Sequence, residues 1–238
     1  MEFVDSLSPR AYSAWLSNPD DLRQPPPPGE HVRLFRSDLL EACSLTPVWV
    51  PLAVWLPVAA AISAPSIAAL PVTSSLALLV WGALTWSCIE YLLHRFLFHI
   101  DPARISSGAA FLLHGIHHYA SQDELRLVMP PPLTFFCGGL IFVLSAVLAR
   151  ITGMHMQHSV WYAGGILGYV VYDETHYCLH HLKGGPLALR RLRARHLVHH
   201  HVPTLNFGVT TSLWDTLCRT ARVRRAAPRG TAAPAKAA

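Results

Sequence analysis

The stretch ACSLTPVWVPLAVWLPVAAAISAPSIAALPVTSSLALLVWGALTWSCI, residues 42–89, decides the fold of this chain. None of its 48 residues is charged. A helix that crosses a membrane needs about 20 predominantly apolar residues, so the tract is long enough for two crossings. We place these crossings at about residues 47–64 and 70–93, with residues 65–69 as the turn between them.

Two further uncharged tracts follow. The first lies between Arg126 and Arg150 and predicts a third crossing at about residues 132–149. The second is weaker and predicts a fourth crossing at about residues 159–175, although a buried helix of a soluble domain is the alternative there. Its three glycines lower its hydrophobicity, but small residues also permit close packing of helices in lipid.

These tracts predict an all-α integral membrane protein with four transmembrane helices in two hairpins and a cytosolic helical cap. Residues 1–45 form a cytosolic N-terminal segment with a proline-rich linker at 25–28 and an amphipathic stretch at 32–45. Residues 46–220 form the membrane domain. Residues 221–238 are a basic tail rich in alanine and proline that we expect to be disordered. The five cysteines are dispersed and support neither disulfides nor a cysteine metal site.

The distribution of arginine and lysine predicts the orientation. These residues concentrate in segments 95–126 and 183–195 and after residue 218, whereas the two predicted hairpin turns hold only Arg150. Cytoplasmic loops carry an excess of such residues. We therefore expect both termini and the intervening histidine-rich segments to be cytosolic. The net charge of +5 fits contact with anionic lipid headgroups, and no basic stripe interleaved with aromatic residues indicates nucleic-acid binding.

Ten histidines form four clusters just outside the apolar tracts: HRFLFH, HGIHH, HYCLH and HLVHH. They are His94, His99, His114, His117, His118, His176, His180, His196, His199 and His200. Neutral imidazole is the commonest metal ligand, and residues three or four apart share one face of a helix. Ten imidazoles exceed the roughly four ligands of one zinc ion. They suit two five- or six-coordinate ions that keep positions open for dioxygen and substrate.

Spacing within the clusters predicts their local geometry. In HGIHH (114–118) and HLVHH (196–200) the histidines are related as i, i+3 and i+4, so on a helix all three imidazoles of a triplet should point the same way. His94 and His99 lie roughly 140° apart on an ideal helix, so we expect this pair to straddle a helix end. The remaining histidines are expected to bind no metal: His181 and His201 beside the clusters, and His31, His155 and His158 at the surface.

Carboxylates are expected to support the imidazoles. A metal-bound histidine usually donates its second ring N–H to a carboxylate or a carbonyl group. Glu90 lies four residues before His94, and Asp173 lies three before His176, so both are candidates for this role. The alternative is that each caps a helix or pairs with an arginine.

The residues around the histidines carry a resemblance to a known family. The segments are EYLLHRFLFH (90–99), FLLHGIHHY (111–119), RLVMPPP (126–132), GYVVYDETHYCLHH (168–181), and HLVHH with NFGVTTSLWD (within 196–215). Together they resemble the fatty acid 2-hydroxylases of the membrane fatty acid hydroxylase superfamily, over about residues 33–219. The resemblance is specific, because the residues beside each cluster agree as well as the histidines do.

The resemblance implies a membrane di-iron monooxygenase that inserts one oxygen atom from O2 at C2 of a long-chain fatty acid or of the acyl chain of a sphingolipid. The ten histidines would hold two iron ions, and zinc could occupy the site in a purified sample. The first 45 residues are too few for the fused haem domain of larger eukaryotic members. Electrons are therefore expected from a separate haem or iron–sulfur protein.

Other functions compete with this interpretation. A sterol or carotenoid oxygenase of the same superfamily would share the histidines. A zinc-dependent membrane hydrolase is less consistent, because neither triplet carries the glutamate of a His-Glu-x-x-His motif. A metal transporter should place its ligands near the middle of the membrane, whereas these flank the spans. Imidazole suits iron, zinc and copper alike, and a free fatty acid, an acyl thioester and a ceramide all stay open as substrates.

Overall fold

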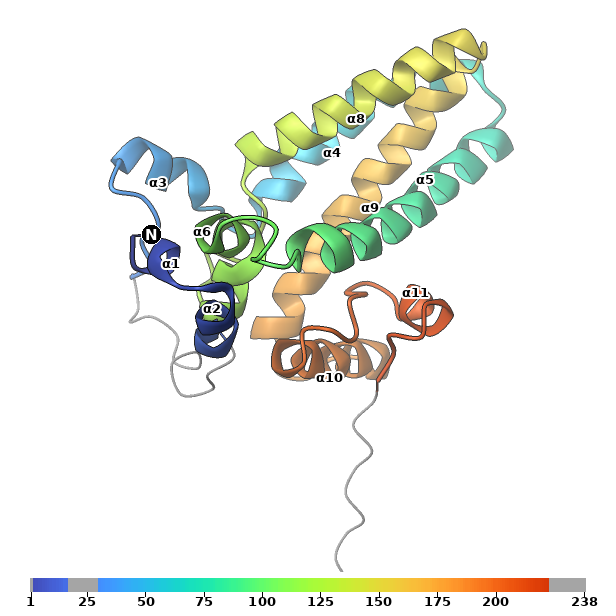
Figure 1. Cartoon of the computed structure of the whole chain (residues 1–238). Coiled ribbons are helices and arrows are strands. Elements are labelled where there is room, and N and C mark those ends of the chain that lie inside the picture. The colour runs from blue at the N-terminus through green and yellow to red at the C-terminus, as the bar shows by residue number, and fades with distance from the viewer. Residues whose placement is uncertain (1, 17–29, 223–238) are drawn as a thin grey trace, which may run out of the picture.

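The computed structural model describes residues 2–16 and 30–222, and every regular element among them is a helix (Figure 1). The proline-rich linker and the tail from residue 223 onward lie outside the described residues. Three described helices are long and apolar enough to cross a membrane: Val50–Ala69, Val72–Phe98 and Pro131–Ile151. They comprise α4 (Val50–Ala69), α5 (Val72–Leu93) with its extension η1 (His94–Phe98), and α8 (Pro131–Ile151).

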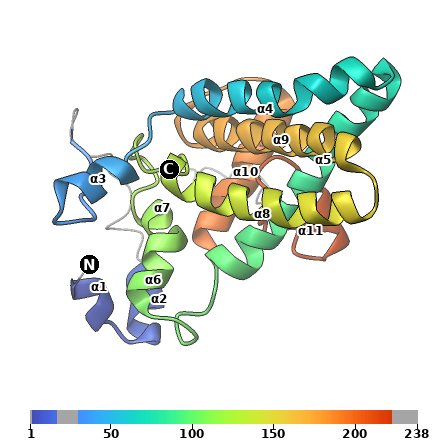
Figure 2. The same ribbon diagram turned by 90° about the horizontal axis from the view of Figure 1, so that it is seen from above.

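A fourth long helix, α9 (His155–His181), lies at the centre of the bundle and contacts α4, α5 and α8 (Figure 2). It is not apolar enough along its length to count with the other three, because it begins with His155, Gln157 and His158 and its second half carries acidic residues and further histidines. The α4–α5 turn and the α8–α9 turn lie at the same end of the bundle (Figure 1). The histidine-bearing ends of α5 and α9 lie at the other.

The turn predicted at residues 65–69 is wrong, because α4 continues to Ala69 with Pro57 and Pro65 inside it. Prolines are tolerated within membrane helices because neighbouring helices, Ser and Thr side chains and local backbone adjustments satisfy the carbonyl groups that proline leaves without a partner. The chain turns at Leu70 and Pro71 instead. A residue before proline disfavours the helical conformation, and Leu70 is extended, with φ −94° and ψ 153°.

Short helices cover the histidine-bearing end. They are α1 (Glu2–Ser6), α2 (Pro9–Leu16), α3 (Asp38–Ser44), α6 (Ser107–Ala110), η2 (Phe111–Gly115), α7 (Ile116–Tyr119), α10 (Leu187–His201) and α11 (Leu213–Leu217). The helices α1 and α2 were not predicted, and they pack on η2 through buried Val4, Tyr12 and Phe111. Only the second half of the predicted amphipathic stretch is helical. Ser37 begins that helix by accepting a hydrogen bond from the Leu40 N–H at 3.4 Å.

Helices α5 and α9 approach each other closely at two glycines. A Cβ atom on Gly82 would lie 2.0 Å from the Trp161 carbonyl oxygen, and one on Gly164 would lie 2.2 Å from the Leu79 carbonyl oxygen. Only residues without a side chain fit at such positions. The Trp161 indole N–H also donates to Thr85 Oγ1 at 3.2 Å, which fixes the register of the two helices.

Replacement of Gly82 by alanine should therefore destabilise the protein, because backbone atoms must move to admit one methyl group. Overpacking of this kind costs about 1–3 kcal/mol. Thermal unfolding in detergent measures the effect. The matched control is Gly139→Ala on α8, where a Cβ atom would meet nothing within 4 Å. Equal unfolding temperatures for the two variants would contradict the close approach.

Candidate metal centre

A π-helical turn brings together the first two histidines. At the end of α5 the helix widens into η1, and the His99 N–H donates to the His94 carbonyl oxygen at 3.2 Å, a bond between residues five apart. Such turns place residues i and i+5 one turn apart and occur frequently at functional sites. His94 and His99 straddle the helix end as predicted, and the widened turn lets both imidazoles join one group.

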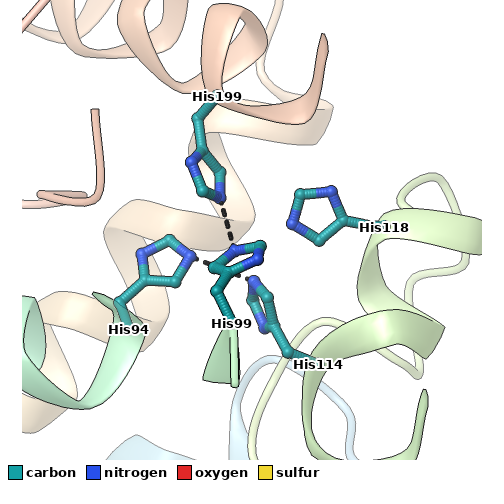
Figure 3. A group of neighbouring side chains, drawn as sticks. All are labelled: His94, His99, His114, His118 and His199. Carbon is teal, nitrogen blue, oxygen red and sulfur yellow. Dashed lines mark hydrogen bonds between the residues drawn. The ribbon is translucent and has the colours of Figure 1, made fainter. Parts of the chain in front are cut away.

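The ten clustered histidines form two groups. The first group, shown in Figure 3, contains His94, His99, His114, His118 and His199. The second group contains His117, His176, His180, His196 and His200. Within each group, one nitrogen per imidazole lies within 4.8 Å of the corresponding nitrogen of every other member. Eight of the ten side chains are buried, and His99 and His200 are half-buried.

The prediction that the three imidazoles of a triplet point the same way is wrong. His114 and His118 enter the first group while His117 enters the second, and His199 enters the first group while its triplet partners enter the second. Around the axis of a helix, residue i+4 is rotated by only about 40° from residue i, whereas residue i+3 is rotated by about 60° in the opposite direction. This difference directs the middle histidine of each triplet to the neighbouring group.

The nitrogen positions fit a metal ion better than they fit hydrogen bonding. His196 Nε2 lies 3.1 Å from His176 Nε2, 2.8 Å from His180 Nε2 and 3.1 Å from His200 Nε2. A single ring nitrogen, as donor or acceptor, cannot serve three partners well. With a metal–nitrogen distance of about 2.1 Å, ligands at right angles lie about 3 Å apart. The donor set of each group, nitrogen only, suits iron, zinc or copper.

Burial keeps the imidazoles neutral. Loss of solvent, followed by the proximity of other imidazoles, holds the pKa of His117, His196 and His200 well below the usual value. The same causes lower the pKa of His114 and His118 in the first group. Neutral imidazole is the form that binds metal, so these groups need release no proton at neutral pH.

Backbone carbonyl groups hold two imidazoles of the first group. His94 Nδ1 donates to the Phe207 carbonyl oxygen at 2.5 Å, and His199 Nδ1 donates to the Leu205 carbonyl oxygen at 2.8 Å. Both carbonyls belong to the segment 205–210, here termed the strap. A metal ligand whose second nitrogen donates to a carbonyl has a fixed tautomer and ring orientation.

Two buried carboxylates fix the strap. Glu90 Oε1 accepts from the N–H groups of Val209 at 2.7 Å and Thr210 at 3.1 Å. Asp215 accepts from the N–H groups of Phe207 and Gly208, both at 2.9 Å. Glu90 therefore acts on the strap, and the strap acts on His94. Sequence reasoning missed Asp215, although it ends NFGVTTSLWD, one of the segments that carried the family resemblance.

Asp173, the second predicted support, lies in a cavity wall. It is buried, and its Oδ2 has no hydrogen-bond partner among the residues that the structure describes. The cavity, of about 260 Å³, is also lined by His114, His117 and His176, so it reaches both groups. No hydrogen bond joins Asp173 to an imidazole within the described part of the chain.

A second, apolar cavity of about 190 Å³ extends between the long helices. Its lining includes Trp86 of α5, Leu133 of α8 and Ile166 of α9. Phe98, Leu113, Met129 and Leu133 line both cavities. Their common wall places the space beside the histidines next to an apolar space among the spans.

The other histidines lie outside both groups. His201 is exposed and His181 half-buried, and neither belongs to the two groups described above. His155 is exposed, whereas the prediction of a surface position for His158 is wrong. Because α9 begins at His155, His158 lies one turn inside the helix and faces α8, with Nε2 2.9 Å from Ser145 Oγ.

Comparison with known proteins agrees with this geometry. The family model described as fatty acid hydroxylase matches residues 79–220. The dihydroceramide fatty acyl 2-hydroxylase FAH1 of Arabidopsis thaliana is 35% identical over 210 residues, which cover 86% of this chain and 83% of that protein. The ceramide very long chain fatty acid hydroxylase SCS7 of Saccharomyces cerevisiae is 37% identical over 205 residues, which cover 82% of this chain and 51% of that protein.

A solved structure described as full-length scs7p, with only its hydroxylase domain visible, has the same fold. The TM-score is 0.78 at 32% sequence identity, and the match covers 92% of this chain and 82% of the other. The chain spans about half the length of the yeast protein SCS7 in the sequence comparison. The histidine geometry, the family match and these relatives together show that the chain belongs to the fatty acid hydroxylase family.

Proposed function

We propose that this protein catalyses the O2-dependent 2-hydroxylation of a long-chain fatty acid or of the acyl chain of a sphingolipid. The ten histidines of the two groups are the proposed ligands of two iron ions. The observation that carries the proposal is the pair of adjoining cavities, because one contains histidines of both groups and the other is an apolar space among membrane helices. Relatives named for fatty acid and dihydroceramide hydroxylation support the choice of substrate.

Each cavity would hold a different part of the substrate. The apolar cavity between α5, α8 and α9 would hold the acyl chain, because burial of each methylene group contributes about 0.8 kcal/mol. The polar end would then lie in the first cavity beside Asp173 and His176. In this arrangement the C2 carbon, next to the carbonyl group, would lie near the histidines that line the first cavity.

The two iron ions would supply the oxidising power that no amino-acid side chain has. The protein positions the acyl chain, and the apolar lining excludes water from the reacting carbon. Glu90 and Asp215 hold the strap, and the strap carbonyls orient His94 and His199. These residues fix the ligands before any substrate enters.

We infer that α9 is the fourth crossing and that the histidine-bearing end faces the cytosol. Both hairpin turns lie at one end of the bundle, and the arginine-rich segments lie at the other (Figure 1). By the positive-inside preference, both termini and the two groups would lie on the cytosolic side. Electrons would come from a separate protein, and membrane lipids surround the spans.

Replacement of His196 by alanine should abolish formation of 2-hydroxy acyl lipids. It should also lower the metal content from two ions per chain to about one, because the second group loses the nitrogen to which three others converge. Mass spectrometry of the lipids of an expressing host that lacks 2-hydroxy lipids, with elemental analysis of the purified protein, measures both. His201→Ala on the same helix is the control. Full metal content and product in His196→Ala would contradict the proposed ligand set.

Replacement of Asp215 by asparagine should leave a folded but impaired enzyme. Loss of a support outside the ligand set typically costs about 10–100-fold in metal affinity or activity. The rate at which a chelator removes the metal should rise together with the loss of activity. Asp38→Asn is the matched control, since Asp38 is exposed and pairs with Arg33 on the surface. Equal metal-release rates in the two variants would show that the strap does not hold the ligands.

Replacement of Gly165 by leucine should shift the products toward shorter acyl chains. Gly165 lines the apolar cavity, and a Cβ atom there would have its nearest neighbour at 3.8 Å, so the new side chain enters the cavity without displacing backbone. The chain-length profile of the 2-hydroxy products measures the shift, with metal content unchanged. Gly139→Leu, at a position with nothing within 4 Å, is the control. An unaltered profile in Gly165→Leu would place the acyl chain elsewhere.

A further inference from the structure

One face of α10 is exposed and positively charged. It consists of Leu187, Arg190, Arg191, Ala194 and Leu197, here termed the outer face of α10. The helix, LALRRLRARHLVHHH, contains no acidic residue. Arg190 and Arg191 form no ion pair with any residue that the structure describes, unlike Arg195, which lies 3.8 Å from Asp215. Two neighbouring unpaired guanidinium groups with leucines on either side are a surface suited to an acidic protein.

The opposite face of the same helix carries metal-group histidines. His199 belongs to the first group, and His196 and His200 belong to the second. A helix with its side chains is about 10–12 Å across, so the outer face lies on the order of 10 Å from imidazoles of both groups. A protein docked on this face would be separated from both groups by a single helix.

The location of α10 favours a protein over the membrane as the occupant. In Figure 1 the helix lies across the histidine-bearing end of α9, at the end of the molecule opposite the two hairpin turns. The spans α5 and α9 end at the histidines, and α10 lies beyond them. Lipid headgroups at the ends of the spans would therefore meet the ends of α4, α5 and α8 before they met this face.

The proposed reaction requires an electron donor that can come close to the histidine groups. Conversion of a C–H bond to a C–OH group with O2 consumes two electrons and two protons and releases one water molecule. The acyl substrate supplies only the two electrons of its C–H bond, so the other two come from outside. A one-electron carrier protein must deliver them in two transfers, and each transfer requires close approach to the metal groups.

We propose that the outer face of α10 is the docking surface for a one-electron carrier protein with an acidic surface. This inference rests on the proposed function, because only a redox reaction needs such a partner. Arg190 and Arg191 steer the acidic partner and hold it over His196, His199 and His200. Attraction of this kind raises the association rate and weakens as salt screens the charges.

The test uses the full-length, iron-loaded protein in detergent and the double variant Arg190→Glu/Arg191→Glu. Electrons come by two routes: from a soluble acidic [2Fe–2S] ferredoxin with its reductase and NADPH, or from dithionite in a single turnover with O2. The control is Arg10→Glu/Arg104→Glu, which makes the same change in charge at two exposed positions outside α10. Formation of the 2-hydroxy product is measured at low and high salt, together with binding of the oxidised ferredoxin.

At low salt, we expect the ferredoxin-driven rate of the α10 variant to fall by about tenfold or more, and most of its ferredoxin binding to be lost. The reason is that the reversed charges repel the acidic partner. Its dithionite-driven product should equal that of the wild type, and the control should keep both. An unchanged ferredoxin-driven rate, an equal loss in the control, or an equal loss with dithionite would overturn the docking surface. Absence of dithionite-driven product in the wild type would instead overturn the proposed function itself.

Discussion

The convergence of ten neutral imidazoles is the constraint on which the rest of the structure depends. A buried polar group without a partner costs roughly 1–3 kcal/mol, and the inner nitrogens of each group face one another instead of solvent. Two bound cations would convert this cost into a stabilising interaction. The four segments that carry histidines must therefore meet at one place, and the long helices, their glycine contacts and the short covering helices all serve that meeting.

A second layer of polar contacts gives the convergence its geometry. Glu90 on α5 and Asp215 within α11 are far apart in the sequence, yet both accept hydrogen bonds from the strap. Asn206 lies within the strap with a positive φ of 55° and bonds the carbonyl oxygens of Arg195 and Arg222. The C-terminal segment thus closes over the histidine groups by backbone hydrogen bonds. Its order depends on two buried carboxylates rather than on hydrophobic packing alone.

The sequence predicted the features that follow from composition and missed those that follow from contacts. Uncharged tracts located the long helices, and the histidine clusters located the residues that form the two groups, because both signals are local. The turn at Leu70 was misplaced, since Pro65 has the same local signal as Pro71 and only the full helix distinguishes them. The split triplets and the role of Asp215 depend on how α10 meets α7 and the strap. Neither contact produces a periodic pattern in the sequence from which it could be predicted.

The division of each triplet between the two groups has a consequence for how the centre can change. A small rotation of α10 about its axis moves His199 relative to one group and His196 and His200 relative to the other. The same holds for His114, His117 and His118 near α7. The two histidine groups are therefore mechanically linked through α10 and α7, and neither can be adjusted alone by moving one of these two helices. Independent adjustment is left to the elements that serve a single group: α9, which carries His176 and His180 of the second group, and the strap, whose carbonyl oxygens accept from His94 and His199 of the first.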